Sequence, residues 1–396
     1  MKKQTVLLTI LVFSLTLFAQ EIQEKAVAIN IEVPVRVFKG KTFINNLTID
    51  DFEIYEDGIL QKTEAVYLIN KTNIEREDTE MNKEEAREKF APKVFRNFVF
   101  LFEMHEYLPT VGKAIELFFN DVYSKGDTLL VVTPSQSYNF NNKVLDRLTE
   151  KEMSKQLIAQ LRKDLRLSAS EYRGLLIDLE DLRKYQGSGA FEPDLVRLMH
   201  SAILTKLTNL KYIDENKMVK FADTLEKVDG PKHVFFFLQK LVVPTMGTDS
   251  VDLRGFQAYM SFDENKIKQI FSSSSITAHM VYVTKTSDSE FVSGGKSLTS
   301  TSIMRSSNAQ PPRVMQDLSG NFFSAFKDIA EATGGIVEST TNVAASFKKA
   351  ADASENYYLL YYSPKNYVAS GKFKEIKIKV KGQRYKISHR AGYIAD

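Results

Sequence analysis

Three polar side chains of types that could carry out chemistry follow an apolar, strand-like run at 98–102. They are Glu103, His105 and Glu106. Imidazole and carboxylate together are acceptable ligands for Zn²⁺, and the same groups would suit a hydrolase. A catalytic zinc site needs three protein ligands held by further hydrogen bonds, and the whole chain has only five histidines. No nucleophile is identifiable beside His105, so the favoured interpretation is a polar loop at a strand end.

Other motifs that could bind ligands are weaker. Gly334 and Gly335 follow a predicted helix and precede a predicted strand, the reverse of the order in phosphate-binding loops. The carboxylates between Asp50 and Asp57 lack the spacing of an EF-hand, and a capped turn beside a solvated strand explains them. Gly-x-Ser-x-Gly, His-Glu-x-x-His and Walker sequences do not occur. We therefore expect a protein that is not an enzyme and has no cofactor.

The elements that must position these residues include four unbroken apolar runs, which are typical of strands buried on both faces. The runs are 97–102, 128–132, 233–238 and 279–283. Between the first two, apolar residues recur at helical spacing from Val111 to Val122. A strand, an amphipathic helix and a strand in this order predict a βαβ unit with a parallel sheet. Further helices are predicted at about 320–333 and 343–354.

Two stretches are longer than the connections of a minimal α/β repeat. Residues 143–227 are charged and carry leucines at helical spacing, which predicts three or four helices, at least one pair of them an insertion. A Gly- and Pro-containing segment at 187–193 breaks these helices. Residues 284–316 are rich in Ser, Thr and Gly, which predicts a long surface loop.

Both ends of the chain have β character. Residues 26–38 alternate between apolar and polar, and Pro34 predicts an edge position or a bulge because it cannot donate a hydrogen bond. Asp57 and Gly58 predict a hairpin turn, and three strands are expected after residue 355. Since two or three strands alone are marginally stable, we expect the two ends to form one small antiparallel β-sandwich. The expected organisation is a signal peptide at 1–20, β-sandwich at 21–70, a charged linker at 71–94, an α/β domain at 95–354, and β-sandwich at 355–396.

Five motifs in this order resemble the bacterial VWFA-related exported proteins, over nearly the whole chain after residue 20. They lie at 33–38, 47–58, 329–335, 358–364 and 390–393. The resemblance implies a von Willebrand factor A-like domain, in which a doubly wound, mostly parallel sheet binds ligands at the carboxyl ends of its strands. The expected fold class is this α/β sheet with a helical insertion, plus the small β-sandwich.

The resemblance also implies where a metal would bind. In A domains with a metal-ion-dependent adhesion site, Asp-x-Ser-x-Ser follows the first strand, a further Asp follows the fourth, and their oxygens hold Mg²⁺. Here Glu103 stands at the Asp position, and His105 and Tyr107 replace the serines. Gln239 and Lys240 stand where Ser/Thr-Asp-Gly is usual. One charged oxygen is too few for a cation that takes six ligands, so we expect a degenerate site without metal.

The start of the chain and its composition indicate the compartment. Lys2 and Lys3 precede an apolar run at 6–18, which is the layout of a signal peptide and is shorter than the roughly 20 residues that span a bilayer. We expect export to the periplasm or beyond, without stable membrane insertion. The absence of cysteine excludes disulfides and lipoprotein acylation. A net charge of +3 gives no support for nucleic-acid binding.

Three hypotheses for function remain. The first is a metal-independent protein-binding or adhesion-type module with an unidentified protein partner. Its candidate contacts are side chains near the expected loop ends: His105, Glu106, Tyr107, Tyr138, Phe140 and Lys240. The second is a structural subunit of a cell-envelope assembly that uses the strand near Pro34 or the helical insertion. The third is a hydrolase that uses Glu103, His105 and Glu106.

Overall fold

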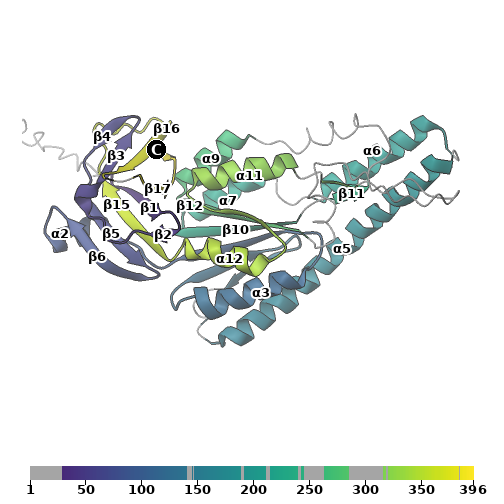
Figure 1. Ribbon diagram of the computed structural model, residues 1–396, viewed down its shortest axis with the longest axis horizontal. Coiled ribbons are helices and arrows are strands. Elements are labelled where there is room, and N and C mark those ends of the chain that lie inside the picture. Colours follow the sequence, from purple (N-terminus) through teal and green to yellow (C-terminus); the bar gives the residue numbers. More distant parts are fainter. Residues whose placement is uncertain are drawn as a thin grey trace, which may run out of the picture.

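The structure is a computed structural model. It describes residues 29–140, 145, 147–188, 191–210, 215–239, 242–244, 263–284, 315–317, 320–382 and 384–396. The expected signal peptide at 1–20 and nearly all of the loop expected at 284–316 lie outside this part of the chain. The molecule is elongated, with a β unit at one end, a central sheet between helices, and a helical arm at the other end (Figure 1).

The central sheet has six strands in the order β14, β12, β10, β7, β8 and β9. Their bounds are Val337–Thr340, Ile276–Val283, Lys232–Gln239, Asn97–Glu103, Thr128–Val132 and Ser137–Phe140. The first five pair in parallel. β9 runs antiparallel to β8, after a tight turn in which the Thr133 N–H donates to the Gln136 carbonyl at 2.9 Å. Every residue of β10 is buried, as its unbroken apolar run predicts.

Helices pack on both faces of this sheet (Figure 1). One face carries α3 (Pro109–Leu117), the short helix η2 (Phe118–Val122), α12 (Val343–Asp352) and the first half of α5 (Glu150–Ser188). The other face carries α7 (Glu215–Glu226), α9 (Glu264–Ser273) and α11 (Gly320–Ala332). The helices predicted at about 320–333 and 343–354 are confirmed as α11 and α12. At the start of α12 the Asn342 side chain accepts a hydrogen bond from the Ala345 N–H, a cap of the kind that favours helix initiation.

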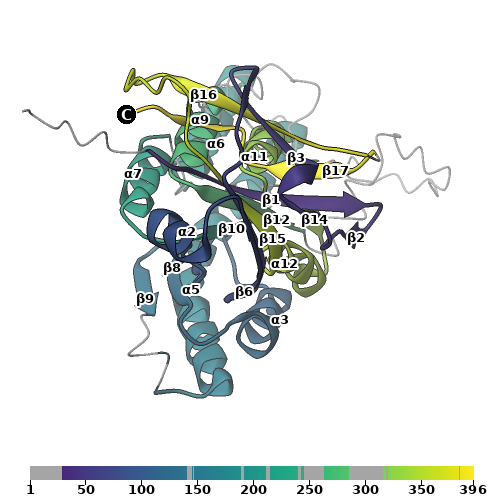
Figure 2. The ribbon, with the colours of Figure 1, turned by 90° about the vertical axis from the view of Figure 1, so that its left-hand side faces the viewer.

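The β unit joins the two ends of the described chain in two antiparallel sheets, which Figure 2 views from this end of the molecule. The larger sheet is curled and has the order β17, β1, β15, β5, β6, with β2 paired to β1. Its strands are Lys386–His389, Ile31–Lys39, Asn356–Tyr362, Ala65–Asn70, Asn73–Thr79 and Thr42–Phe43. The second sheet has the order β18, β16, β3, β4, with bounds Gly392–Ile394, Phe373–Val380, Phe52–Glu56 and Ile59–Gln61. A 3₁₀ turn, η1 (Ile49–Asp51), precedes β3.

Two local predictions for the β unit have different outcomes. The hairpin at Asp57 and Gly58 is confirmed, because both residues have positive φ (48° and 80°) and join β3 to β4. The edge position of Pro34 is wrong, because β1 lies between β15 and β17. β17 pairs with β1 only from Val35 to Phe38, so the ladder needs no N–H from Pro34.

The predicted fold class is wrong. The sequence was taken to encode a doubly wound, mostly parallel sheet with one small antiparallel sandwich, whereas the molecule is a mixed α/β protein. Three of its described sheets are antiparallel, namely the two of the β unit and the β11–β13 pair, and the central sheet is mixed because of β9. The prediction placed Tyr138 and Phe140 near expected loop ends, without a strand there, and treated 71–94 as a charged linker with some helix. Those residues form β9, β6 and the helix α2 (Lys83–Phe90), and β6 pairs antiparallel with β5.

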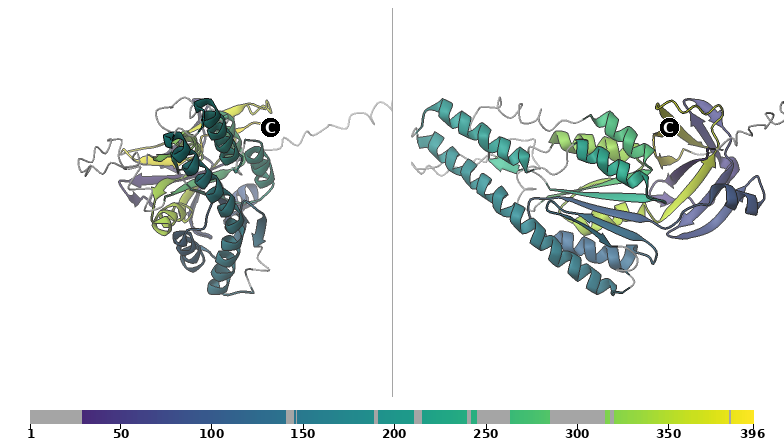
Figure 3. Two further views of the ribbon diagram at one scale, coloured as in Figure 1. Left: turned by 90° about the vertical axis from the view of Figure 1, so that its right-hand side faces the viewer. Right: turned by 180° about the vertical axis from the view of Figure 1, so that it is seen from behind.

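The arm consists of the second half of α5 together with α6 (Pro193–Asn209) (Figure 3). α5 has 39 residues, which corresponds to about 58 Å at 1.5 Å per residue. Its first half, from Met153 to Leu165, belongs to the core beneath the sheet. Its second half, from Tyr172 to Leu182, packs against α6 in the other core. At the base of the arm, β11 (Val242–Pro244) pairs antiparallel with β13 (Met315–Asp317).

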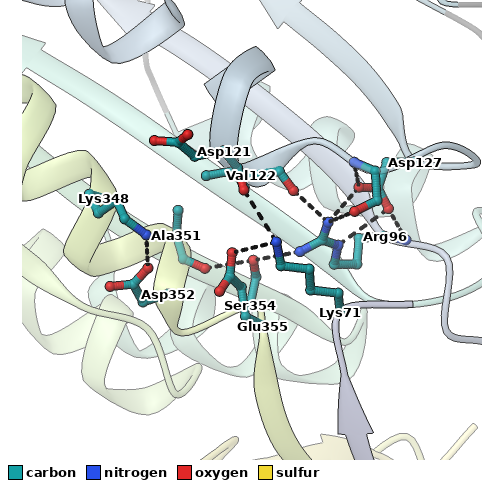
Figure 4. Close-up of polar contacts among 11 residues, drawn as sticks. Lys71, Arg96, Asp121, Val122, Asp127, Lys348, Ala351, Asp352, Ser354 and Glu355 are labelled. Carbon is teal, nitrogen blue, oxygen red and sulfur yellow. Dashed lines mark hydrogen bonds and ion pairs between the residues drawn. The ribbon is translucent and has the colours of Figure 1, made fainter. Parts of the chain in front are cut away.

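A buried ion pair stabilises the start of β7, where the chain enters the central sheet (Figure 4). Arg96 and Asp127 are fully buried, and Arg96 Nη2 lies 2.6 Å from Asp127 Oδ2. Arg96 also donates to the Val122 carbonyl at 2.8 Å, so it ties β7 to the end of η2. Nearby, Lys71 of the β unit contacts Glu355 at 3.6 Å. These contacts link the β unit, β7 and the segment before β15.

The motifs behind the family resemblance meet where the β unit contacts the central sheet. Arg390 is buried and donates to the carbonyls of Ser272 and Glu32. The Gly334 carbonyl accepts from Arg36, and a Cβ on Gly335 would lie 1.8 Å from the Ala278 carbonyl oxygen. Gly334 therefore permits close packing against His389 of the β unit, and Gly335 permits close packing against β12 within the central sheet, both structural roles.

Candidate functional site

The carboxyl ends of β7 and β10 form the candidate site. The chain passes from β7 to β8 on one side and later to β10 on the other. Such a change of direction opens a crevice beyond the strand ends in which open α/β sheets generally bind ligands. The arm lies at this end of the molecule (Figure 1), and its helix α5 contributes to the crevice.

The Gln239 side chain closes the crevice between the two strands. Its Oε1 accepts hydrogen bonds from the backbone N–H groups of His105, at 3.0 Å, and Glu106, at 3.2 Å. Its Nε2 donates to Glu106 Oε1 at 3.0 Å. One carboxamide thus joins the end of β10 to the backbone and the acid of the loop after β7. A shorter side chain at this position would not span the gap.

His105 is covered by the arm. Its ring stacks on Tyr172 of α5, with the ring centroids 4.5 Å apart and the planes 17° apart, and the residue is only 4% exposed. Glu103 ends β7 and is also buried, beside Leu238 of β10. Four of the predicted site residues, Glu103, His105, Glu106 and Gln239, are therefore close together. A substrate in solution would not reach the imidazole without displacing Tyr172.

These residues do not fit the magnesium ion that the family resemblance implies. A hard cation takes about six oxygen ligands, whereas the Gln239 carboxamide already bonds to Glu106 and to two backbone N–H groups. Those N–H groups point to where a ligand oxygen would have to lie. Within the part of the chain that the structure describes, no group of three His, Cys, Asp or Glu residues could hold a metal ion. Lys240 lies outside the described residues.

The three predicted aromatic contacts pack against the core on the face of the sheet that carries α5. The Tyr107 ring lies beneath the Arg162 guanidinium, 4.8 Å from its Cζ, against α5. Tyr138 and Phe140 lie on β9 and are half-buried. The Tyr138 hydroxyl donates to Asp164 of α5 at 2.8 Å, and burial together with that carboxylate raises the pKa of Tyr138. Tyr138 and Phe140 thus attach the sheet edge to α5, and their role as partner contacts stays a prediction.

A small apolar cavity of about 150 Å³ lies near the strand ends. Its lining includes Leu101, Phe236, Met218 and Phe221. Pockets for drug-sized ligands have roughly 300–1,000 Å³, so this cavity is too small for most organic substrates. It therefore adds no catalytic function to the crevice.

The sequence did not reveal the most exposed apolar surface near the end of the arm. Five large side chains there are 40–68% exposed: Tyr185, Phe191, Leu195, Leu198 and Met199. We call them the arm-tip surface. The rings of Tyr185 on α5 and Phe191, just before α6, meet edge to face at 5.2 Å, so the surface joins the end of α5 to the segment that leads into α6. The sequence contains one indication of this surface, a second apolar stripe within residues 193–209. The prediction assigned these apolar residues to one helical face.

A second group that sequence reasoning missed lies where the β unit meets the central sheet. His233 and His279 are buried on β10 and β12, with Nδ1 of His233 3.4 Å from Nε2 of His279. Burial and the nearby Arg96 lower the pKa of His233 to about 3, and burial lowers the pKa of His279. The Glu32 carboxyl lies in the same region, and burial raises its pKa. These groups make the contact region sensitive to pH.

No family model matches the chain, and no curated protein or solved structure matches it. Among the described residues, none of the helices combines the length and apolar character that crossing a membrane requires.

Proposed function

We propose that this chain is an exported, non-enzymatic protein-binding module that recognises its partner through the arm and without a metal ion. The arm-tip surface carries the proposal. Scattered exposed apolar residues are normal on proteins, whereas a contiguous apolar group with two aromatic side chains is typical of interaction sites. Arms that project from a rigid body are suited to contacting another protein, because the partner can approach without steric conflict with the body.

The closed crevice supports a metal-independent mode of binding. In the resembled A domains, an open metal coordination site would receive a carboxylate from the partner. Here the Gln239 carboxamide bonds to Glu106 and to backbone N–H groups at that place, and Tyr172 covers His105. The proposed kinship with VWFA-related exported proteins then rests on the five sequence motifs and the expected compartment, and the arm is the proposed recognition surface.

The same geometry disfavours a hydrolase. His105 is 4% exposed and stacked against Tyr172, and Glu106 is hydrogen-bonded to Gln239. A general base must lie within hydrogen-bond reach of a bound substrate. With the imidazole covered, the crevice offers no such position.

Affinity capture with matched variants tests the proposal. The immobilised chain is exposed to envelope extract from its own source, with and without EDTA. Leu198→Glu disrupts the arm-tip surface at a position 68% exposed, and Val368→Glu changes an equally exposed residue (65%) between β15 and β16. We expect Leu198→Glu to lose the captured protein, and both Val368→Glu and EDTA treatment to leave capture unchanged. Capture that EDTA abolishes, or that survives Leu198→Glu, would contradict the proposal.

A further inference from the structure

The helix α6 has two apolar faces, and only one of them is covered. Val196, Ile203, Leu204 and Leu207 are buried in the core shared with α5. On the other side, Leu195, Leu198, Met199 and Ala202 are exposed. The exposed residues follow the spacing i, i+3, i+4, i+7, which places them on a single helical face.

This second face has the pattern of a helix that packs against another helix. A helix on the surface of a globular protein normally presents one apolar stripe to its core and polar side chains to water. Two stripes on one helix are expected where a helix contacts partners on two sides, as in a helix bundle. In the described part of the chain, α5 is the helix that packs against α6. The exposed stripe lacks a counterpart there.

From this arrangement we propose that the stripe packs against the same stripe of a second copy of this chain, so that two arms form a four-helix bundle. The proposal rests on the proposed function, since it names the partner of the arm-tip surface. Two identical hairpins that meet about a two-fold axis place each apolar stripe against an identical one. The arm then completes a standard helical architecture.

Charge around the stripe is compatible with a second copy. Three ion pairs flank the arm-tip surface, each between residues three positions apart in one helix: Arg183 with Glu180, Lys184 with Asp181, and Arg197 with Asp194. Because these cations are matched within the arm, the surface does not present a strong field of one sign that would select an oppositely charged partner. Two copies can therefore approach without large like-charge repulsion.

The available area is close to what a specific contact requires. A large apolar side chain buries about 150–250 Å² when it is fully covered. The five half-exposed side chains of the arm-tip surface would thus bury on the order of 500 Å² per copy, before the polar rim is counted. Standard interfaces bury about 800 Å² per partner, so the arm-tip surface together with its polar rim approaches the area of a dimer interface.

Sedimentation equilibrium of the purified chain tests this proposal. We expect a concentration-dependent dimer for the wild type and for Val368→Glu. Leu198→Glu, which alters an exposed position and so leaves the monomer folded, should weaken dimerisation at least about tenfold, the effect of about 1.4 kcal/mol. Circular dichroism of each variant verifies the fold. A wild type that remains monomeric, or a dimer that persists in Leu198→Glu, would overturn the proposal.

The absence of cysteine allows a test of the geometry. A single Met199→Cys substitution lies at the middle of the stripe, where two copies related by a two-fold axis bring the same residue together. Oxidation should cross-link Met199→Cys rapidly, because disulfides need Cα atoms within about 7 Å. Ile59→Cys, an exposed position on β4, should not cross-link at the same rate, and equal rates would count against the bundle.

The two experiments separate the failure of this inference from the failure of the proposed function. If the chain is a monomer and capture of a different protein still depends on Leu198, the second copy is refuted and the arm remains a binding surface. If Leu198→Glu captures its partner normally, the arm is not the binding surface and both proposals fail.

Discussion

Single residues decide the chemistry of the strand ends. Gln239 provides one acceptor for two backbone N–H groups and one donor for Glu106. The same backbone framework with Asp and Ser side chains would offer oxygens to a cation. The difference between a metal site and a closed crevice therefore depends on the side chains at a few positions.

Replacement of Gln239 by leucine tests this role. The variant keeps a similar size but removes the acceptor for the His105 and Glu106 N–H groups. Each buried donor without a partner costs about 1–3 kcal/mol, and two donors lose their acceptor, so we expect the free energy of unfolding to fall by at least about 2 kcal/mol. Urea unfolding measures the change. A stability equal to that of the wild type would mean that water replaces the carboxamide.

The buried pair His233 and His279 predicts loss of stability in acid. Burial lowers the pKa of His233 to about 3, and the pKa of His279 lies well below its usual value. Both rings are neutral in the folded protein, whereas the unfolded chain protonates them below about pH 6.5. The unfolded state then binds more protons, so stability decreases as pH falls from about 6.5 towards 3, by about 1.4 kcal/mol per pH unit for each histidine.

The substitution His279→Phe isolates this effect. Phenylalanine keeps an aromatic ring beside Phe235, which stacks on His279 at 4.6 Å, but it cannot take up a proton. The variant should lose less stability than the wild type between pH 7 and pH 5, by about 2 kcal/mol. Urea unfolding at both pH values gives the difference. Identical losses in the two proteins would show that His279 is not held neutral.

At the level of elements, the entry of the chain into β7 depends on the Arg96–Asp127 pair. Arg96→Met leaves the Asp127 carboxylate buried without its guanidinium, and loss of one partner of a buried pair costs about 3–5 kcal/mol. The double variant Arg96→Met with Asp127→Leu removes both charges and should recover most of that loss. A double-mutant cycle by urea unfolding measures the coupling. Additive effects would contradict a coupled pair.

Some helices and strands could be predicted from the sequence, and others could not. α12, the βαβ unit and the Asp57–Gly58 hairpin follow from local periodicity and turn chemistry. β9 was missed because four alternating residues are too few to identify a strand, and they gain their place by pairing with β8. β6 was missed because it is rich in charged residues and largely exposed, so no apolar pattern identified it.

The position of the candidate site could be predicted from the sequence, but the arrangement of its side chains could not. The ends of the apolar runs identified Glu103, His105, Glu106 and Gln239. The stacking of Tyr172 on His105 joins residues distant in sequence, and only the packing of α5 reveals it. The arm-tip surface remained hidden because two apolar faces on one helix cannot be separated by periodicity alone.

At the scale of the whole molecule, the proposed dimer should be insensitive to salt. Its interface is apolar, and the flanking ion pairs lie within each copy. Screening weakens exposed charge pairs between molecules, so the dissociation constant is expected to change less than about threefold between 50 and 500 mM NaCl. Sedimentation equilibrium at both concentrations measures it. A steep weakening with salt would indicate an electrostatic interface instead.

The continuity of α5 has a mechanical consequence. One half of this helix is held in the core beneath the sheet, and the other half extends to the tip of the arm. Tyr172, which covers His105, lies at the start of the second half. The helix therefore connects the tip of the arm to the strand ends without a break. Because close-packed protein interiors transmit strain, a force applied at the tip would reach His105, with no loop in α5 to absorb it.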